Sequence, residues 1–314
     1  MAQPSGQLST VAGLGAILLW STTFAVARSL SEQVGPVTAG AAVYTVGGAV
    51  CVIRLAVSPA RIGELFRLPL RYLLGCGSLF ALYTATIYLA IGLARNRDQL
   101  LEIALVNYLW PALTLLLSIP LLRKRGRVWL VPGTALALAG VALVMTQGAA
   151  ITWRTWLDHV GSNPLAFALA FVAAVSWGLY SNLTRRWAEG GGDGAVELFL
   201  PATALALIVI RWFLHEASVW SPRAAAETAV LATVTAVAYV LWDLAMRRGN
   251  LLLVATCSYF TPLLSTAVSC AYLGVPTSSQ LWIGCALLVA GSLITWKSVG
   301  EATTTQATGA ETTR

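Results

Sequence analysis

The sequence predicts an all-α integral membrane protein with ten transmembrane helices, arranged as two inverted five-helix repeats. Three observations predict this fold. The 314 residues are 57% apolar and only 11% charged, with a mean hydropathy of +0.74. Ten runs of mostly apolar residues approach the length of about 20 residues that a bilayer crossing requires. The second half of the chain also repeats the first.

The composition excludes most classes of soluble protein. An ordinary soluble domain is roughly 25% charged, and a soluble chain of this length could not hide so much apolar surface from water. We therefore expect no water-soluble enzyme. The net charge of +7 does not indicate nucleic acid, because the basic residues stand singly or in small groups between apolar runs.

The expected helices follow one another with short connectors. The polar N-terminal tail (1–8) has no Lys or Arg, unlike a secretory signal peptide. The connector at 147–163 carries two tryptophans and an arginine, a mixture typical of a short helix at the membrane interface. Residues 298–314 are rich in Thr, Ala, Gly and Glu and predict a disordered tail. The ten spans are placed at 9–29, 36–57, 69–93, 99–122, 128–146, 164–185, 195–214, 224–246, 251–274 and 278–297.

The basic residues predict the orientation of the chain. If both termini are cytoplasmic, fourteen Lys and Arg residues fall on the inside and six on the outside. This distribution agrees with the positive-inside rule. A missed or additional span would mix the two sets, so the count also favours ten spans. The connector at 147–163 then lies outside and the tail at 298–314 inside.

An internal repeat divides the spans into two halves, at 9–146 and 164–297. Shifting the chain by 151 residues aligns 81–140 with 232–291 without a gap, and 21 of the 60 pairs are identical. The identities include Arg, Tyr, Pro and Gly, which a shared bias toward Leu and Ala does not produce. Since each half holds five spans, an odd number, the second half enters the membrane upside down. Many alternating-access transporters have this architecture.

Aromatic and hydroxyl residues recur on one face at mid-span in both repeats. Any one of them could pack in the bundle or face lipid, but their recurrence favours the lining of a central cavity. Prolines at 111 and 262 each follow a tyrosine by three residues and predict kinks in the cavity wall. Such a lining favours apolar or aromatic substrates and can hold a cationic amine over ring faces. The expected lining residues are Trp20, Tyr83, Tyr88, Tyr108, Trp177, Tyr180, Ser181, Tyr239, Trp242 and Tyr259, with kinks at Pro111 and Pro262.

Two acidic residues inside the spans are candidates for a charged cavity or gate. Glu102 lies about one turn inside its helix, where it either faces the cavity or pairs with Arg95 or Arg97. Asp243 precedes Arg247 by four residues, a spacing that favours a snorkelling pair at the cytoplasmic end. Neither has the paired carboxylates of a dedicated proton relay.

We expect no metal, cofactor or nucleotide. The five cysteines lie in apolar segments without a CxxC pattern or a nearby histidine. The sequence has no GxxxxGK[ST] phosphate-binding loop. An ATP-driven pump is therefore excluded within this chain.

Several strings resemble a known family. They are Leu18-Leu19-Trp20-Ser21-Thr22, Gly35-Pro36-Val37, Asn107-Tyr108-Leu109-Trp110-Pro111 and Ser258-Tyr259-Phe260-Thr261-Pro262. Together with the ten spans and the two repeats, they resemble the EamA-like branch of the drug/metabolite transporter superfamily, and within it the bacterial exporters of aromatic amino acids. The resemblance covers the chain up to its C-terminal tail.

The resemblance implies a bacterial inner-membrane exporter of aromatic and other neutral amino acids, which works from a central aromatic-lined cavity. Trp20, Trp110 and Trp177 match the motif tryptophans, and Tyr108 and Tyr259 match the motif tyrosines. Near Tyr83 and Tyr88 the match requires a one-residue gap, so either tyrosine can be the cavity residue. The connector at 147–163 is then periplasmic.

Two alternatives remain open. A broader efflux carrier for cationic aromatic compounds or other small metabolites would depend on Glu102 or Asp243. A membrane enzyme or scaffold would require polar catalytic clusters or large soluble loops, and the sequence has neither. The expected partners are a small-molecule substrate and the lipid bilayer, without nucleic acid. We expect the chain to work as a monomer, by alternating access.

Overall fold

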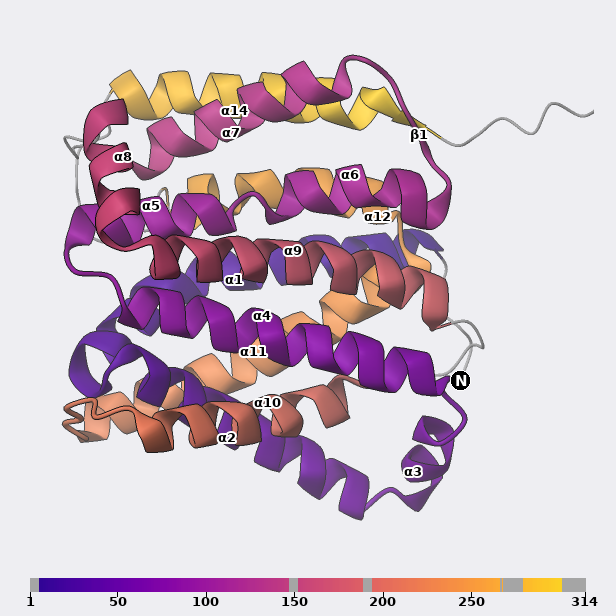
Figure 1. Ribbon diagram of the computed structural model, residues 1–314. Helices are drawn as coiled ribbons and strands as arrows, with labels where there is room; N and C mark the ends of the chain where they lie inside the picture. Colours follow the sequence, from indigo (N-terminus) through magenta and orange to yellow (C-terminus); the bar gives the residue numbers. More distant parts are fainter. Residues whose placement is uncertain (1–5, 147–151, 189–193, 266, 268–278, 301–314) are drawn as a thin grey trace, which may run out of the picture.

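The computed structural model describes residues 6–146, 152–188, 194–265, 267 and 279–300, which are helical apart from connections and one short strand pair (Figure 1). A π-helical turn, η1 (Tyr72–Cys76), precedes α4, and a 3-10 turn, η2 (Ser258–Phe260), follows α12. Strands β1 (Arg125–Gly126) and β2 (Val299–Gly300) pair antiparallel. The helices are α1 (Gly6–Val34), α2 (Pro36–Ala56), α3 (Pro59–Leu65), α4 (Gly77–Gly92), α5 (Arg97–Asn107), α6 (Trp110–Leu122), α7 (Leu130–Met145), α8 (Trp153–Ser162), α9 (Pro164–Trp187), α10 (Val196–Phe213), α11 (Pro222–Arg248), α12 (Leu251–Cys257) and α14 (Ser279–Ser298).

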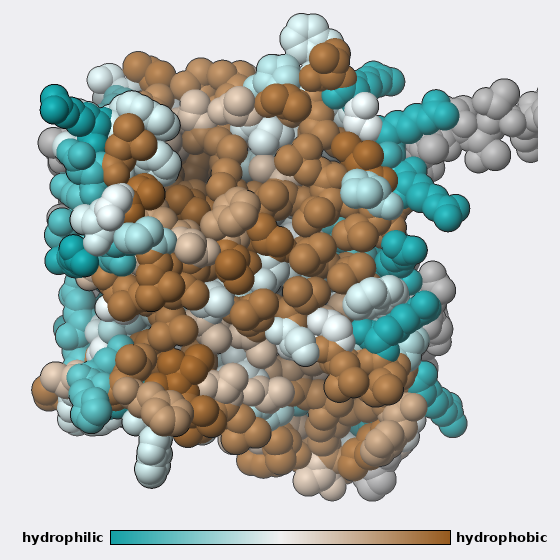
Figure 2. Space-filling model, in the orientation of Figure 1, coloured by the Kyte–Doolittle hydropathy of each residue, from teal (hydrophilic) through white to brown (hydrophobic). Residues whose placement is uncertain are grey.

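The chain is an all-helical membrane protein. Within the described residues, seven helical segments are long and apolar enough to cross a bilayer, and α1, which bends by 47°, would be an eighth. Two shorter apolar helices span Leu130–Met145 and Leu251–Ser265. These helices fall on the ten expected segments, except that residues 266 and 268–274 of the ninth expected span (251–274) lie outside the described residues. Figure 2 shows the corresponding surface, where a broad apolar face is bordered by polar side chains at two opposite edges.

The two opposite edges define the ends of the bundle. Gly6, β1 and β2 lie at one end, which we call the termini end, and α8 lies at the other, which we call the α8 end (Figure 1). The helices run between these ends, so their middle turns occupy the centre of the apolar band. Whether each helix crosses completely remains part of the prediction of ten spans.

Local sequence explains where the helices begin. Prolines occupy the first turn of α2, α9 and α11, where a missing N–H breaks no hydrogen bond. The Ser221 hydroxyl accepts from the Ala224 N–H at the start of α11, and the Asn250 side chain accepts from the Leu253 N–H at the start of α12. Gly35 precedes α2 with a φ of 89°, which allows the sharp turn from α1 into α2.

The main helix pairs all join the two halves of the chain. They are α1–α11, α2–α10, α4–α9, α6–α9 and α7–α14. The counterparts in the two repeats are α1 and α9, α2 and α10, α4 and α11, α6 and α12, and α7 and α14. When each helix is replaced by its counterpart, nearly the same set of pairs results. The pairs α2–α10 and α7–α14 map onto themselves, α1–α11 maps onto α9–α4, and α6–α9 maps onto the observed contact of α12 with α1. The packing is therefore two-fold symmetric in its pairing.

Glycines bring the backbones of α7 and α14 together. A Cβ added to Gly140 would lie 2.6 Å from the Gly284 carbonyl oxygen, and one added to Gly291 would lie 2.7 Å from the Gly133 carbonyl oxygen. Small residues allow such close approach between membrane helices. In the repeat alignment Gly133 corresponds to Gly284 and Gly140 to Gly291, so exchanging the halves maps this interface onto itself.

Both ends of the chain are more ordered than the sequence indicates. The expected polar tail at 1–8 gives way to α1 at Gly6, because the first turn of α1 packs on the α11–α12 connection, where the Asn250 N–H donates to the Thr10 hydroxyl at 2.8 Å. The expected disordered tail does not begin at residue 298, because Ser298 is helical and β2 pairs with β1. The rest of both tails, 1–5 and 301–314, and residues 147–151 of the connector lie outside the described residues.

Candidate functional site

A cluster of aromatic rings occupies the middle of the bundle. Trp177 lies at its centre, thirteen residues after the start of α9 and ten before its end, which places it about 20 Å and 15 Å from those ends. The indole is in contact with rings from α1, α4, α6, α9 and α11. Its ring centroid is 4.6 Å from Tyr83, 5.0 Å from Tyr180, 5.7 Å from Tyr239, 5.8 Å from Trp242, 5.9 Å from Trp20, 6.1 Å from Phe80 and 6.2 Å from Trp110.

Both halves of the chain supply rings to this aromatic cluster. Most of its members are buried, whereas Trp20 and Tyr83 are partly buried. Tyr180 and Trp242 are 0% exposed, and Trp177 is 2% exposed. Most of the ring pairs are edge-on or tilted, the arrangement that aromatic quadrupoles favour. The rings therefore pack against one another at the centre of the bundle, where the sequence predicts a cavity lining.

Two polar atoms at this cluster have no hydrogen-bond partner among the described residues. They are the indole N–H of Trp242 and the hydroxyl of Ser181, which follows Tyr180 on α9. A buried polar atom without a partner costs about 1–3 kcal/mol. The Trp242 N–H and the Ser181 hydroxyl are therefore free to bind a polar group that enters the aromatic cluster.

Three of the predicted lining residues lie apart from the centre. Tyr88 lies at the edge of the aromatic cluster: its ring is 6.4 Å from that of Tyr44 on α2, which in turn lies 6.1 Å from the ring of Tyr239. Tyr108 and Tyr259 belong to a second apolar cluster, which packs against α7 and α14 around Leu115 and Leu288. The sequence pattern therefore groups residues that the fold separates.

The α-helical path is interrupted just before each of the two predicted kink prolines. In the first half, α5 ends at Asn107 and α6 begins at Trp110, with Pro111 in its first turn. In the second half, α12 ends at Cys257 and the 3-10 turn η2 leads to Pro262. Each interruption lies at mid-bundle, so the first one presents Trp110 to Trp177 and Trp242.

A buried ionic network lies between the aromatic cluster and the termini end. Asp243 Oδ2 accepts from Arg247 Nε at 2.7 Å, and Asp243 Oδ1 accepts from the Tyr72 hydroxyl at 2.9 Å and from the Tyr180 hydroxyl at 3.4 Å. The Ala195 N–H in turn donates to the Tyr72 hydroxyl at 3.1 Å. This network, which we call the Asp243 lock, ties together η1, α9, the start of α10 and α11.

The predicted pair of Asp243 with Arg247 is present, but it does not snorkel to solvent. The two side chains are only 2% and 7% exposed. A buried pair is stable only when its remaining lone pairs and protons are satisfied. Tyr72 meets this need for the Asp243 carboxylate, and η1, a π-helical turn, carries it.

A second ion pair lies at the same end. Glu197, at the start of α10, accepts from Arg61 Nε at 2.7 Å and pairs with Arg54 Nη1 at 3.1 Å. Arg61 also donates to the Gly194 carbonyl at 2.5 Å. A Cβ on Gly194 would overlap the Asp243 carboxylate, so this glycine lets the two networks meet. Together they hold α2, α3, α10 and α11 at the termini end.

Other carboxylates hold the α8 end. Glu216 accepts from the N–H groups of Val37 and Thr38 at 3.0 and 2.7 Å, and so caps the start of α2. Glu102 is fully buried and its Oε2 lies 2.9 Å from His159 Nδ1 on α8. Among the described side chains, this histidine is the partner of Glu102, and Arg95 is not; the side chain of Arg97, the other partner that the sequence suggests, lies outside the described part of the chain. The structure therefore places Glu102 at the docking of α8 and Asp243 at the lock.

Several site residues were not found from the sequence. The hydroxyl of Tyr44 on α2 lies 2.5 Å from that of Tyr239, Phe80 is 4.6 Å from Tyr239, and Tyr72 completes the Asp243 lock. Phe80 could have been found, because it lies three residues before Tyr83 and four before Thr84 on the same helix face. Tyr44 and Tyr72 stand alone in their segments and carry no signal in one sequence.

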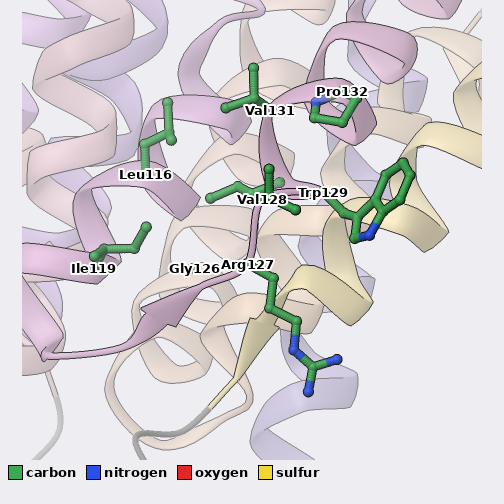
Figure 3. Close-up of a pocket in the computed structure, with 9 residues that line it drawn as sticks. Leu116, Ile119, Gly126, Arg127, Val128, Trp129, Val131 and Pro132 are labelled. Atoms are coloured by element: carbon green, nitrogen blue, oxygen red, sulfur yellow. The ribbon is translucent and has the colours of Figure 1, made fainter.

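Two apolar grooves open on the sides of the molecule, and neither includes a residue of the aromatic cluster. The larger, of about 660 Å³, lies at the termini end between α6 and the start of α7 (Figure 3). The other, of about 500 Å³, lies among α2, α10 and α11. The described residues contain no group of three or more His, Cys, Asp or Glu side chains able to hold a metal ion.

Comparison with known proteins follows the two halves. The sequence model of the EamA-like transporter family matches residues 7–146 and 164–297. The aromatic amino acid exporter YddG of Salmonella typhimurium is 33% identical over 93% of this chain and 98% of its own length. The exporter of the same name from Escherichia coli is 32% identical over 92% and 97%, and that from Ancylobacter novellus is 34% identical over 91% and 96%. One solved structure, 31% identical, superposes with a TM-score of 0.76 over 93% of this chain and 98% of the other.

Proposed function

The chain belongs to the EamA-like transporter family, and on this premise we propose that it exports aromatic and other neutral amino acids by alternating access. Family membership makes it a multi-pass membrane transporter and not an enzyme. The substrate and the direction are the proposed part. The aromatic cluster is the observation that carries the proposal, because it is drawn from both halves and lies at mid-helix.

The proposal includes ten spans in two inverted repeats, with both termini in the cytoplasm of a bacterial inner membrane. The two-fold pairing of helices supports this arrangement, as does the antiparallel strand pair that joins the ends of α6 and α14. The distribution of fourteen basic residues inside and six outside supports the orientation. The termini end is then cytoplasmic and α8 periplasmic.

Differences between repeat counterparts support two alternating states. Tyr239 lies 5.7 Å from Trp177 at the centre, whereas its counterpart Tyr88 lies at the edge. Inverted repeats generate two states related by a pseudo-two-fold axis in the membrane plane, in which such counterparts exchange environments. We propose that Tyr88 and Tyr239 exchange places in this sense when the bundle opens at the other end.

The proposed binding mode follows from the chemistry of the aromatic cluster. When the rings of the cluster separate, the aromatic side chain of the substrate takes a place beside Trp177. Its contacts with the surrounding rings then replace the ring–ring contacts that were lost. The indole N–H of Trp242 and the Ser181 hydroxyl donate to the substrate carboxylate, and ring faces hold the ammonium group. The Asp243 carboxylate is already bound by Arg247, which favours neutral amino acids over cationic compounds.

Export requires that the Asp243 lock opens to admit substrate from the cytoplasm. Tyr72, Asp243 and Arg247 bridge helices that must part for a path from the termini end to Trp177. We assign the lock as the cytoplasmic gate. An apolar membrane interior disfavours charged side chains, and a role in the gate explains why Asp243 and Arg247 are present there.

The test is transport by the full chain in phospholipid vesicles. We expect flux of labelled Phe and Trp, weaker flux of Thr, and none of a quaternary aromatic amine. Trp177→Ala should reduce Phe flux at least about tenfold, whereas Trp212→Ala should leave it unchanged, because Trp212 is 83% exposed on α10. Absence of flux for every amino acid would overturn the proposal, and flux of the amine alone would favour a carrier for cationic aromatic compounds.

A further inference from the structure

The loop between α6 and α7 concentrates positive charge at the termini end. Four of the five residues from 123 to 127 are Lys or Arg, and the sequence has no acidic residue between Glu102 and Asp158. Arg123, Arg125 and Arg127 are exposed, and none forms an ion pair with a carboxylate of the described residues. These three guanidinium groups are therefore available to an external anion.

The backbone fixes this basic segment in place. Arg123 ends α6 in the left-handed conformation, with a φ of 53°, which turns the chain back sharply. Arg125 and Gly126 then pair with β2, and the Arg127 N–H donates to the Ser298 carbonyl at 2.8 Å. A left-handed arginine costs about 1 kcal/mol and persists only where its surroundings require it. The charges are thus held on a defined edge.

An apolar groove of about 660 Å³ adjoins this basic segment, and Gly126 and Arg127 are among the residues that line it. Leu116 and Ile119 of α6 form one wall, and the segment from Val128 to Pro132 forms the other. Figure 3 shows the apolar side chains gathered around the groove, while the guanidinium of Arg127 extends away from them. The volume is within the range of small-molecule sites. The groove therefore has an apolar part and a cationic edge.

The position of the groove relative to the bilayer is marked by its exposed side chains. Trp129 is 63% exposed and Val128 is 81% exposed, just before α7 enters the apolar band. Tryptophans at this depth lie at the level of lipid headgroups. A bound molecule would thus have its apolar part beside α6 and α7 and its charged part at the membrane surface.

We propose that this groove is a binding site for one anionic phospholipid. The phosphate contacts the guanidinium groups of Arg125 and Arg127, and an acyl chain lies against Leu116, Ile119 and Val131. Charge complementarity selects an anionic over a zwitterionic headgroup. The apolar wall selects a lipid over a soluble phosphate. The site lies on the outside of the bundle and takes no part in the aromatic cluster.

The test is lipid retention by the purified full chain, measured by native mass spectrometry. Vesicles of phosphatidylglycerol or of phosphatidylcholine supply the lipid. We expect one phosphatidylglycerol to be retained in preference to phosphatidylcholine. Arg125→Gln with Arg127→Gln should weaken retention about 30-fold, since each cationic side chain near an anionic headgroup contributes about fivefold.

Matched variants distinguish a specific lipid site from a general attraction of anionic lipids to exposed arginines. Arg95→Gln with Arg154→Gln removes two exposed arginines from the α8 end and should leave retention unchanged. Ile119→Trp should fill the groove and reduce retention with all charges in place. Equal loss in both arginine pairs would overturn the proposal, as would full competition by soluble glycerol phosphate. Because retention is measured without transport, its outcome does not depend on the proposed substrate.

Discussion

Replacing Tyr72 by phenylalanine tests the Asp243 lock with the loss of a single oxygen atom. The hydroxyl donates to Asp243 at 2.9 Å and accepts from the Ala195 N–H at 3.1 Å. The aromatic ring itself packs on Phe199, with centroids 5.6 Å apart, and is retained in the variant. Tyr72→Phe should therefore leave packing intact and weaken only the closed state of the termini end.

The size of the effect follows from the two hydrogen bonds. A hydrogen bond to a charged group contributes about 1.5–3 kcal/mol, and an unsatisfied buried N–H costs about 1–3 kcal/mol. Relaxation and access of water in the opened state offset part of this sum. We take about 2 kcal/mol as the net shift, which changes the ratio of open to closed molecules about 30-fold.

Cys76 reports this opening directly. It belongs to η1, four residues after Tyr72, and is 0% exposed in this structure. If opening precedes reaction, labelling of Cys76 by a maleimide, resolved by mass spectrometry, should be about 30-fold faster in Tyr72→Phe. Tyr108→Phe makes the same chemical change at a hydroxyl with no hydrogen bond among the described residues, and should leave the rate unchanged. An unchanged rate in Tyr72→Phe would refute the lock.

Three further predictions concern stability, with unfolding followed by tryptophan fluorescence in detergent unless stated. Gly140→Ala should destabilise the fold by about 1–3 kcal/mol, because the new Cβ would lie 2.5 Å from a backbone nitrogen of α14, whereas Gly63→Ala, which faces open space, should not. Glu197→Gln should lower the free energy of unfolding by about 3 kcal/mol, since the Glu197 carboxylate is 5% exposed and lies between two arginines. Glu64→Gln should lower it by less than about 1 kcal/mol, because Glu64 is 49% exposed. Glu102→Gln should raise hydrogen exchange in α8 about tenfold and not elsewhere, because it weakens the bond to the imidazole of that helix.

The sequence was sufficient for the class of fold and for the family. Apolar run length places the helices to within a few residues, because a bilayer sets the length of apolar helix that it accepts. The family resemblance is confirmed, since the EamA-like model matches both halves. The sequence did not reveal β1 and β2, because two residues that pair across 173 positions leave no periodic pattern.

The candidate site was recovered only in part. The spacing of Asp243 and Arg247 predicts a pair, because residues four apart share a helix face. Tyr72 is 171 residues from Asp243, and His159 is 57 from Glu102, so these partners depend on which helices pack together. Periodicity indicates which face of a helix is buried but not what it meets there.

The pairing of helices across the two halves also bears on how the protein is made. Among the described residues, each long helix of the first half has its main neighbour in the second. During synthesis α1, α2, α4 and α7 enter the bilayer before those neighbours exist, so the first half cannot reach its final packing alone. A chain broken between α7 and α9 should yield two fragments that assemble when they are produced together and are degraded when either is produced by itself.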